Sequence, residues 1–379
     1  MNYKITLPLL ALALLLLAGC AKDEATATAE LQENQDVPAH VQAIVDERLN
    51  QLEKDYENPP IYDDGISSRS VVYVPAGSVD ALQAAINSAG PNGKVVVKSG
   101  THYESGTVTI TQMVRLFGEE GAKIYFNVSP PGTAFPFPVT NVLDPAILIK
   151  DCNQVWIKGL GIYPQGGSGS TGIFLEKGRM ARIEDNLISG FQFGIWVSDN
   201  SNTPRIFDNK LVGNSPEGVW GISIESGKSA QLKGNHISKY ATCIFASDEN
   251  GTMSENTTVG GFSGPLLCTV QGNVQLPNGS MLENATPCKD WLIIKNKGYN
   301  SIWNYVVIDG ANNNFLFRNE SYDAGSGQDI YMLGDSYLTG GFTPSSYNNF
   351  VVNLAGIVTV DCGLNNTVLG GTLLDGPCL

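Results

Sequence analysis

A six-residue pattern that recurs along the chain restricts the possible folds more than any other feature. Its clear central copies start 21 to 26 residues apart. The copies begin at Ile157, Ile183, Ile206, Leu232, Met253 and, after larger steps, Ile293, Leu316 and Phe350. Steps of this length are typical of a solenoid, in which each coil buries its apolar side only by stacking on its neighbours. The repeat therefore predicts a stack of coils.

The fourth place of the pattern is asparagine in every copy except the first, which has Leu160. An asparagine repeated at a turn tolerates left-handed backbone geometry, and its amide can bond to the coils above and below. We therefore expect a structural ladder with no catalytic role. Its central members are Asn186, Asn209, Asn235 and Asn256.

A second repeat lies upstream in each coil and consists of apolar triplets. These begin at Ile147, Ile173, Ile195, Ile222 and Ile244. A glycine precedes three of them, at Gly172, Gly194 and Gly221. Period-two alternation places the first and third residues of each triplet inside the coil and the middle one outside.

Two helices are predicted ahead of the repeats. Apolar residues from Val37 to Tyr56 recur at three- and four-residue steps, and Pro59-Pro60 ends the pattern. We interpret this amphipathic helix as a spacer on the domain surface. A shorter helix is expected to start at Ser78 as N-cap and to end before Gly90.

The order of short helix, Gly-rich turn and strand near Val95, together with runs such as Gly194-Ile-Trp-Val-Ser, resembles the pectate-lyase-like β-helix superfamily and its periplasmic copper-site and carbohydrate-processing relatives. The resemblance covers roughly residues 71–379. It implies an all-β, single-stranded right-handed parallel β-helix whose N-terminal helix caps the open core. It does not name an activity, because this scaffold hosts many.

The first residues have the form of an export signal. A basic start and a short Leu/Ala-rich stretch lead to Leu17-Ala18-Gly19-Cys20, which resembles a bacterial lipobox. The following Lys-Asp-Glu is similar to the surface-export signal of Bacteroidota lipoproteins. We expect a signal peptide at 1–19, a lipid-anchored tether with one helix at 20–70, and a β-helix domain at 71–379. The expected location is the outer membrane, lipid-anchored at Cys20 and exposed at the cell surface.

Six cysteines remain after Cys20, an even number in a compartment that permits disulfides. The pairs closest in sequence, Cys268 with Cys288 and Cys362 with Cys378, are the candidate bridges. Cys152 and Cys243 are at least as well explained as buried thiols.

Charge excludes one class of partner. The chain has 23 Lys and Arg against 37 Asp and Glu, a formal charge of −14, and no basic cluster. A nucleic-acid binder would carry such a cluster. The net charge would repel uronic-acid polymers unless a cation intervened, and it favours a neutral ligand.

Outward residues of stacked strands form columns about 4.8 Å apart, and one such column is aromatic. Exposed rings beside polar groups bind the apolar faces of sugars. The substrate-binding candidates are Phe174, Trp196, Phe245 and Lys150. The alternative is that loops cover these rings, which would then belong to the core.

The next column supplies candidate catalytic acids. Glu176 and Glu225 lie two coils apart, about 9–10 Å between backbones, so their carboxyls could reach the separation that suits an inverting glycosidase. One would be the general acid and the other the base. Asp199 and Asp248 have similar spacing and are alternates. Ordinary solvated acids are the competing interpretation.

Other chemistries receive less support. A lyase would need an arginine or a cation beside the uronate carboxyl, and Arg182 and Arg205 occupy equivalent places on adjacent coils. However, Asp185 and Asp208 are near enough in sequence to be their simple ion-pair partners. Three histidines and no metal-binding motif predict no metal site and no cofactor, although a lyase could use calcium.

Three functions remain. The leading hypothesis is a surface lipoprotein that binds a polysaccharide along the outward face of the β-helix, with cleavage by hydrolysis or elimination as its enzymatic version. The second is a non-catalytic carbohydrate-binding or adhesin-like protein. The third is a structural or protein-interaction solenoid.

Overall fold

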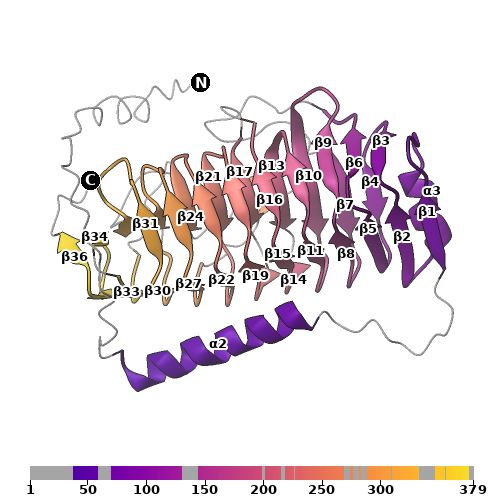
Figure 1. The fold of residues 1–379 in the computed structure, drawn as a ribbon. Helices are drawn as coiled ribbons and strands as arrows, with labels where there is room; N and C mark the ends of the chain where they lie inside the picture. Colours follow the sequence, from indigo (N-terminus) through magenta and orange to yellow (C-terminus); the bar gives the residue numbers. More distant parts are fainter. Residues whose placement is uncertain are drawn as a thin grey trace, which may run out of the picture.

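The computed structural model describes residues 37–58, 70–129, 144–198, 201–214, 218–225, 227–268, 274–275, 281–282, 288–308, 310–332, 346–354 and 356–374. Within them the chain forms a right-handed parallel β-helix of three long sheets, here called A, B and C, with one helix at its N-terminal end and one along its side (Figure 1). This confirms the stack of coils expected from the repeat and the β-helix that the family resemblance implies. No described helix is both long and apolar enough to cross a membrane.

Each long sheet takes one strand from most coils, and its strands pair in parallel. Sheet A consists of β1 (Val71–Val74), β2 (Gly93–Val97), β5 (Val114–Gly118), β8 (Trp156–Lys158), β11 (Arg182–Glu184), β15 (Arg205–Phe207), β19 (Gln231–Lys233), β22 (Thr252–Ser254), β27 (Leu292–Ile294), β30 (Phe315–Phe317), β33 (Phe350–Val352) and β35 (Thr367–Leu369). Sheet B consists of β3 (Gly100–Glu104), β6 (Ala122–Phe126), β9 (Gly161–Pro164), β12 (Leu187–Ser189), β16 (Lys210–Val212), β20 (His236–Ser238), β23 (Thr257–Val259), β28 (Lys297–Tyr299) and β31 (Glu320–Tyr322).

Sheet C consists of β4 (Val108–Ile110), β7 (Pro145–Lys150), β10 (Gly169–Glu176), β13 (Phe191–Ser198), β17 (Trp220–Ile224), β21 (Thr242–Ala246), β24 (Ser263–Cys268), β29 (Tyr305–Ile308), β32 (Ile330–Met332), β34 (Val358–Asp361) and β36 (Thr372–Leu374). Two further pairs are β14 (Ser201–Asn202) with β18 (Gly227–Lys228), and β25 (Val274–Gln275) with β26 (Met281–Leu282).

Register follows the sequence repeats. Ile173 of β10 aligns with Ile147 and Ile195, and Ile183 of β11 aligns with Ile157 and Ile206. These isoleucines are at most 1% exposed and belong to one continuous core inside the coils. The first and third residues of the triplets therefore point inward, as expected.

The asparagine ladder is confirmed at the turn between sheets A and B. The side-chain amide of Asn186 donates to the amide oxygen of Asn209 at 3.0 Å, and the chain of bonds continues through Asn235 and Asn256 to Asn296. Each donor also reaches a backbone carbonyl one coil back, for example Ile157 O at 3.1 Å. Both amide hydrogens and the oxygen are thus used, with almost no exposure to water.

One expectation about this turn is wrong. The left-handed conformation belongs to the residue before each asparagine, with φ of 54° at Asp185, 53° at Asp208 and 58° at Glu255. Glycine fills the same place at Gly159 and Gly234, where φ is 72° and 69°. The asparagine itself remains outside the left-handed region and supplies only hydrogen bonds.

A second ladder in the later coils escaped the sequence analysis. Asn314 donates to Asn349 at 3.0 Å, and Asn349 donates to Asn366 at 3.0 Å. The backbone N–H of Trp291 begins this series by donating to Asn314 at 3.0 Å. The larger sequence steps between later copies therefore do not interrupt the stack.

Helix α3 (Leu82–Ala89) covers the N-terminal end of the core with Leu82, Ala85, Ile86 and Ala89. It starts later than expected, because Ser78 is not its N-cap. Ser78 bonds to the His102 ring instead, and the Glu104 carboxylate accepts the N–H of Leu82 at 2.9 Å. Gly90 ends the helix with φ 68°, as expected.

Helix α2 (Ala39–Glu57) lies along sheet A, next to which it runs in Figure 1. Its apolar residues Val41 and Val45 share a buried cluster with Ile294, Phe317 and Val352. The helix spans about 28 Å. The six strand steps from β11 to β33 span about 29 Å, so the helix matches the part of the sheet that it covers.

The cysteines match the expectations in part. Cys152 and Cys243 are buried thiols, and burial raises the pKa of Cys243 to about 12. The expected bridge between Cys268 and Cys288 is wrong for this structure: both are thiols, with Cys288 in the core beside the Cys268 backbone. Cys362 is disulfide-bonded, and Cys378 lies outside the described residues.

Candidate functional site

The outer face of sheet C does not present the exposed aromatic platform that the sequence predicts. Phe174, Trp196 and Phe245 do point outward from neighbouring strands, but they are 4%, 1% and 7% exposed. They pack into an aromatic cluster with Phe193 and Trp220, whose rings lie 4.9 and 6.1 Å from that of Trp196. The alternative of a second core is therefore the correct one for these rings.

The glycines at Gly194 and Gly221 explain why the sequence pattern missed Phe193 and Trp220, which immediately precede them. A Cβ on Gly194 would lie 2.5 Å from both the Gly221 carbonyl and a Leu211 methyl group, so this position faces the core and admits only glycine. Since Gly194 and Ile195 both face inward, strict alternation fails there. The residue before the glycine turns outward and joins the aromatic cluster.

The candidate acids on the same face are also enclosed or paired. Glu225 is 4% exposed and accepts the Ser223 hydroxyl at 3.1 Å. Glu176 is half-buried and forms an ion pair with Lys150 at 3.1 Å. Asp248 is fully buried, and burial raises its pKa well above the usual value. The structure does not gather these acids around an open cleft, and Asp199 lies outside the described residues.

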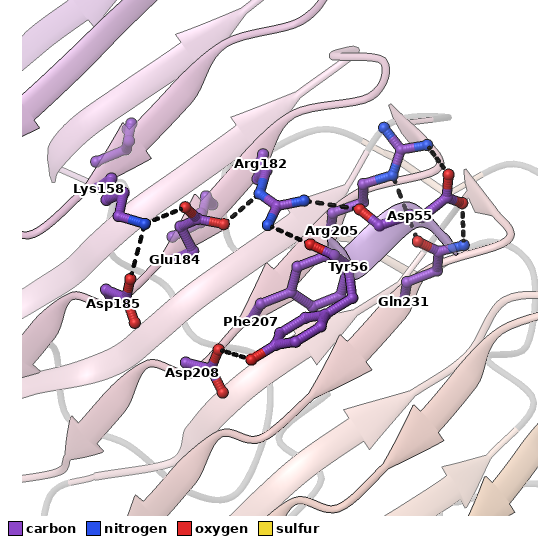
Figure 2. A network of polar contacts seen from close by, with 12 residues as sticks. Asp55, Tyr56, Lys158, Arg182, Glu184, Asp185, Arg205, Phe207, Asp208 and Gln231 are labelled. Carbon is purple, nitrogen blue, oxygen red and sulfur yellow. Dashed lines mark hydrogen bonds and ion pairs between the residues drawn. The ribbon is translucent and has the colours of Figure 1, made fainter. Parts of the chain in front are cut away.

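The outer face of sheet A holds a polar network beneath the C-terminal end of α2 (Figure 2). Arg182 pairs with Glu184 and also donates to the backbone carbonyls of Asp55 and Tyr56. Arg205 pairs with the Asp55 carboxylate at 3.0 Å. Figure 2 shows the two arginines side by side, both directed at the helix end.

The expected arginine partners are therefore wrong. Asp185 pairs with Lys158 at 3.0 Å, and Asp208 accepts the Tyr56 hydroxyl at 2.7 Å. This bond, aided by burial, raises the pKa of Tyr56 to about 12. Because helix α2 occupies the arginines, they are not available to a ligand in this conformation.

The titration of Asp55 reflects its position in the network. Burial raises its pKa, but hydrogen bonds from Gln51 and Gln231 and the charge of Arg205 outweigh burial, so the net pKa lies below the usual value. The ionised carboxylate is thus the form that fastens the helix end to sheet A.

In the described part of the chain, sheet B is the long sheet whose outer face neither a helix nor an aromatic cluster covers. Its outward side chains are exposed or half-buried from β3 to β31. Three tyrosines occupy one column at its N-terminal end, since Tyr103 aligns with Tyr125 and Tyr125 with Tyr163. Their rings stack, with centroids 5.8 and 5.1 Å apart, and Tyr103 is 44% exposed. A second stacked pair, Tyr299 and Tyr322, lies at the far end.

Lysines stand beside these tyrosines in the neighbouring outward column. Lys123 and Lys210 are exposed, and neither forms an ion pair with a described residue. Lys297 pairs with Glu320 at 3.2 Å. This face was not identified from the sequence because the strands of sheet B are short and their repeated pattern is weak. A signal was available in Gly-Thr-His-Tyr-Glu, Ala-Lys-Ile-Tyr-Phe and Gly-Ile-Tyr-Pro: each segment carries one tyrosine, at a place that alternation within the strand puts outward.

The coils, sheets and caps define a right-handed parallel β-helix protein. Residues 105–313, more than half of the chain, match the family described as periplasmic copper-binding protein (NosD), and the chain belongs to this family. A search of curated proteins finds no match.

Similar solved structures share the fold at low identity. An exopolygalacturonase of family 28 from Yersinia enterocolitica is 12% identical, with 82% of this chain and 77% of that chain covered and a TM-score of 0.47. An alginate lyase from Paenibacillus sp. FPU-7 is 11% identical, with 80% and 98% covered and a TM-score of 0.40. The surface protein and adhesin PfbA of Streptococcus pneumoniae is 12% identical, with 78% and 93% covered and a TM-score of 0.39.

The described residues do not suit the copper that the family description names. Copper sites are built from imidazole, thiolate and thioether ligands that converge on one point. His102 is buried with its two ring nitrogens bonded to Ser78 and to the Lys98 carbonyl, whereas His40 and His236 are exposed on separate elements. In the part of the chain that the structure describes, no three His, Cys, Asp or Glu side chains lie close enough to hold an ion. We therefore derive no step through copper.

Proposed function

We propose that this protein is a lipid-anchored protein of the outer-membrane surface that binds an extended polysaccharide on the outer face of sheet B without cleaving it. The observation that carries the proposal is the row of stacked, solvent-accessible tyrosines at Tyr103, Tyr125 and Tyr163. It lies on a sheet that no described helix covers.

The chemistry of this row suits sugars. Phenol rings offer apolar surface to the C–H groups of a pyranose, and their hydroxyls offer hydrogen bonds to its oxygens. The side chains stand on parallel strands of a rigid sheet, so little order is lost when a ligand binds. A flat, regular face accommodates a polymer better than a small molecule, which needs a concave pocket.

Binding is favoured over hydrolysis by the state of the candidate acids. An inverting glycosidase needs two carboxyl groups on an accessible face, with room between them for water and substrate. Glu225 is buried against Ser223, and the column beside it is filled by Trp196 and its aromatic neighbours. The catalytic roles of Glu176 and Glu225 stay predictions that the following assay tests.

The proposal is tested with the purified full-length lipoprotein in detergent, titrated against a panel of neutral and acidic polysaccharides. We expect Tyr125→Ala and Tyr163→Ala each to weaken binding about ten-fold, since aromatic contacts contribute on the order of 1–1.5 kcal/mol. Tyr73→Ala, which removes an exposed tyrosine from sheet A, is the matched control and should leave affinity unchanged.

Two results would contradict the proposal. One is the absence of binding to any polysaccharide. The other is turnover. Release of new reducing ends by the wild type, but not by Glu176→Gln or Glu225→Gln, would establish a hydrolase on sheet C. Unsaturated products that form only with calcium would establish a lyase. Thermal unfolding of every variant separates loss of binding from loss of fold.

The anchor is part of the proposal and has its own test. Cys20 lies outside the described residues, and its role rests on the Leu-Ala-Gly-Cys sequence. We expect metabolic labelling with a fatty acid to mark the wild type but not Cys20→Ser. Protease added to intact cells should degrade the wild-type protein if it faces outward, and protection from the protease would contradict surface exposure.

A further inference from the structure

Resting on the proposed function, we infer that the polysaccharide is anionic and runs across the strands of sheet B, with its carboxylate or sulfate groups on a column of lysines. The net charge of the chain favours a neutral ligand, but the charge of this face has the opposite sign. What a ligand meets is the local charge of its binding face, which steers association.

The lysine column follows from the strand register. Its members, from β3 to β31, are Thr101, Lys123, Gly161, Leu187, Lys210, His236, Thr257, Lys297 and Glu320. The column thus carries three lysines and a histidine against a single acid. That acid, Glu320, already binds Lys297 and the Tyr322 hydroxyl.

Three acids at the turn between sheets A and B bind other residues, whereas Glu120, which precedes Lys123 by three residues, is exposed. At the turn between sheets A and B, Asp185 pairs with Lys158 and Asp208 binds Tyr56. Glu255 lies 3.6 Å from Lys233. These contacts hold the three acids away from the column, and neither Lys123 nor Lys210 forms an ion pair with a described residue.

The spacing of the column fits a polymer. Neighbouring strands lie about 4.8 Å apart, so Lys123 and Lys210, three strands apart, are separated by about 14 Å along the stack. Lys297 lies a further three strands on, so the three lysines span about 29 Å. This length spans several sugar units. The tyrosines stand in the adjacent column, so one chain can contact rings and cations together.

A glycan fits this face better than a nucleic acid. Nucleic-acid binding requires neutralising many closely spaced phosphates, and the affinity scales with the number of cations supplied. A sparse column of lysines on a protein of charge −14 supplies few. Each exposed pair contributes on the order of 1 kcal/mol or less, so repeated charges along a flexible glycan are needed for useful affinity.

The test compares four probes on the full-length protein: alginate, which carries carboxylates, dextran sulfate, uncharged dextran and oligo-thymidylate. The double substitution Lys123→Gln/Lys210→Gln removes the column's open cations. Lys54→Gln/Lys177→Gln removes two exposed lysines from other surfaces and is the matched control. All four positions are exposed, so the variants should fold, as thermal unfolding checks.

We expect at least one anionic glycan to bind more tightly than dextran, with an affinity that falls as salt rises. The Lys123/Lys210 double variant should lose about ten-fold in that affinity, equivalent to about 1.4 kcal/mol, and the control double variant should lose none. Preference between alginate and dextran sulfate identifies the anionic group.

The other outcomes overturn the inference in distinguishable ways. If dextran binds as tightly as the anionic glycans and the Lys123/Lys210 variant is unaffected, the ligand is neutral and the proposed function stands. If no glycan binds, the inference and the proposed function both fail. If oligo-thymidylate binds in a manner that needs Lys123 and Lys210, the face recognises nucleic acid and not a glycan.

Discussion

Asn209 stands in the middle of the ladder between sheets A and B. Its amide donates to Asn235 and to the carbonyls of Ile183 and Phe207, and its oxygen accepts from Asn186. Alanine there would leave buried partners without hydrogen bonds, so we expect Asn209→Ala to lower the free energy of unfolding by roughly 1–3 kcal/mol. Chemical denaturation measures this change.

Asn87, exposed on α3, provides the comparison, since its oxygen accepts one surface bond from Gln83. Asn87→Ala should change the free energy of unfolding by less than about 0.5 kcal/mol. Equal effects of the two substitutions would show that the ladder contributes no more than an exposed amide.

Asp248 gives a pH dependence whose sign is fixed by its burial. Burial raises its folded-state pKa well above the usual value, and Glu249 raises it further, although Trp291 and Arg48 act in the opposite direction. Above the ordinary aspartate pKa, the unfolded chain has lost the proton that the folded protein keeps, so stability falls as pH rises toward the folded-state pKa.

Asn cannot ionise, and the Asp248→Asn substitution should therefore gain stability relative to the wild type as pH rises from 4 toward 8. Thermal or urea unfolding at a series of pH values measures the difference. A constant difference across this range would mean that Asp248 keeps the same proton affinity in both states.

At this scale the sequence was informative where a residue recurs. The asparagines repeat at one place in each copy, and a repeated polar residue in a solenoid predicts a ladder. The residue that takes the left-handed conformation was assigned one place too late. Asp185, Glu255 and Lys295 are charged residues that differ in size and sign of charge, and only Gly159 and Gly234 are residues that favour this conformation. Backbone geometry there is imposed by the coil.

Helix α2 behaves as a brace across the coils from β11 to β33. Its N-terminal half packs through Val41 and Val45. Its C-terminal half combines the buried Leu52 with polar contacts, of which Asp55 against Arg205 is the best defined. Part of the attachment at the C-terminal end of the helix therefore depends on charge. Removing either partner leaves the other buried and unmatched, which costs more than the loss of an exposed pair.

A double-mutant cycle with Asp55→Asn and Arg205→Gln should give a coupling energy of about 0.5–3 kcal/mol in unfolding experiments. The exposed pair Lys98–Glu119 is the control, and its coupling should be the smaller of the two because solvent screens it. A coupling near zero for Asp55 and Arg205 would mean that the helix end is not fastened by this pair.

Acid should weaken the same contact. The pKa of Asp55 lies below its usual value, so the stability that its carboxylate contributes is present above the unfolded-state pKa and is lost as pH falls through the folded-state pKa. Faster proteolysis of α2 at low pH in the wild type, but not in Asp55→Asn, would show this loss.

The existence of α2 was predictable from apolar residues spaced three and four apart. Its position on sheet A was not predictable. The helix pairs with sheet A through residues more than 120 positions away, such as Arg182 with the Asp55 carbonyl. A single sequence carries no direct record of such long-range contacts. For the same reason the aromatic residues of the triplets were correctly expected to point outward, but their burial was not foreseen. Burial of Trp196 depends on Phe193 and Trp220, which pack against it.

On the scale of the whole molecule, the three sheets have different outer faces. Sheet A is closed by α2 from β11 to β33, and sheet C by its aromatic cluster around Trp196. Sheet B remains open and carries the stacked tyrosines and the lysines. The repeat predicted the stack, but choosing the functional face required knowing which faces are covered.

The central claim is that a polysaccharide binds sheet B, and oxidative footprinting with mass spectrometry tests it most directly. Hydroxyl radicals modify exposed rings, so Tyr103, Tyr125 and Tyr163 should react in the protein alone and become protected when alginate, or whichever polysaccharide the panel identifies, is bound. Tyr73 on sheet A should react equally in both states. The account would be contradicted if the three tyrosines reacted equally with and without the polysaccharide while residues on the strands of sheet C became protected.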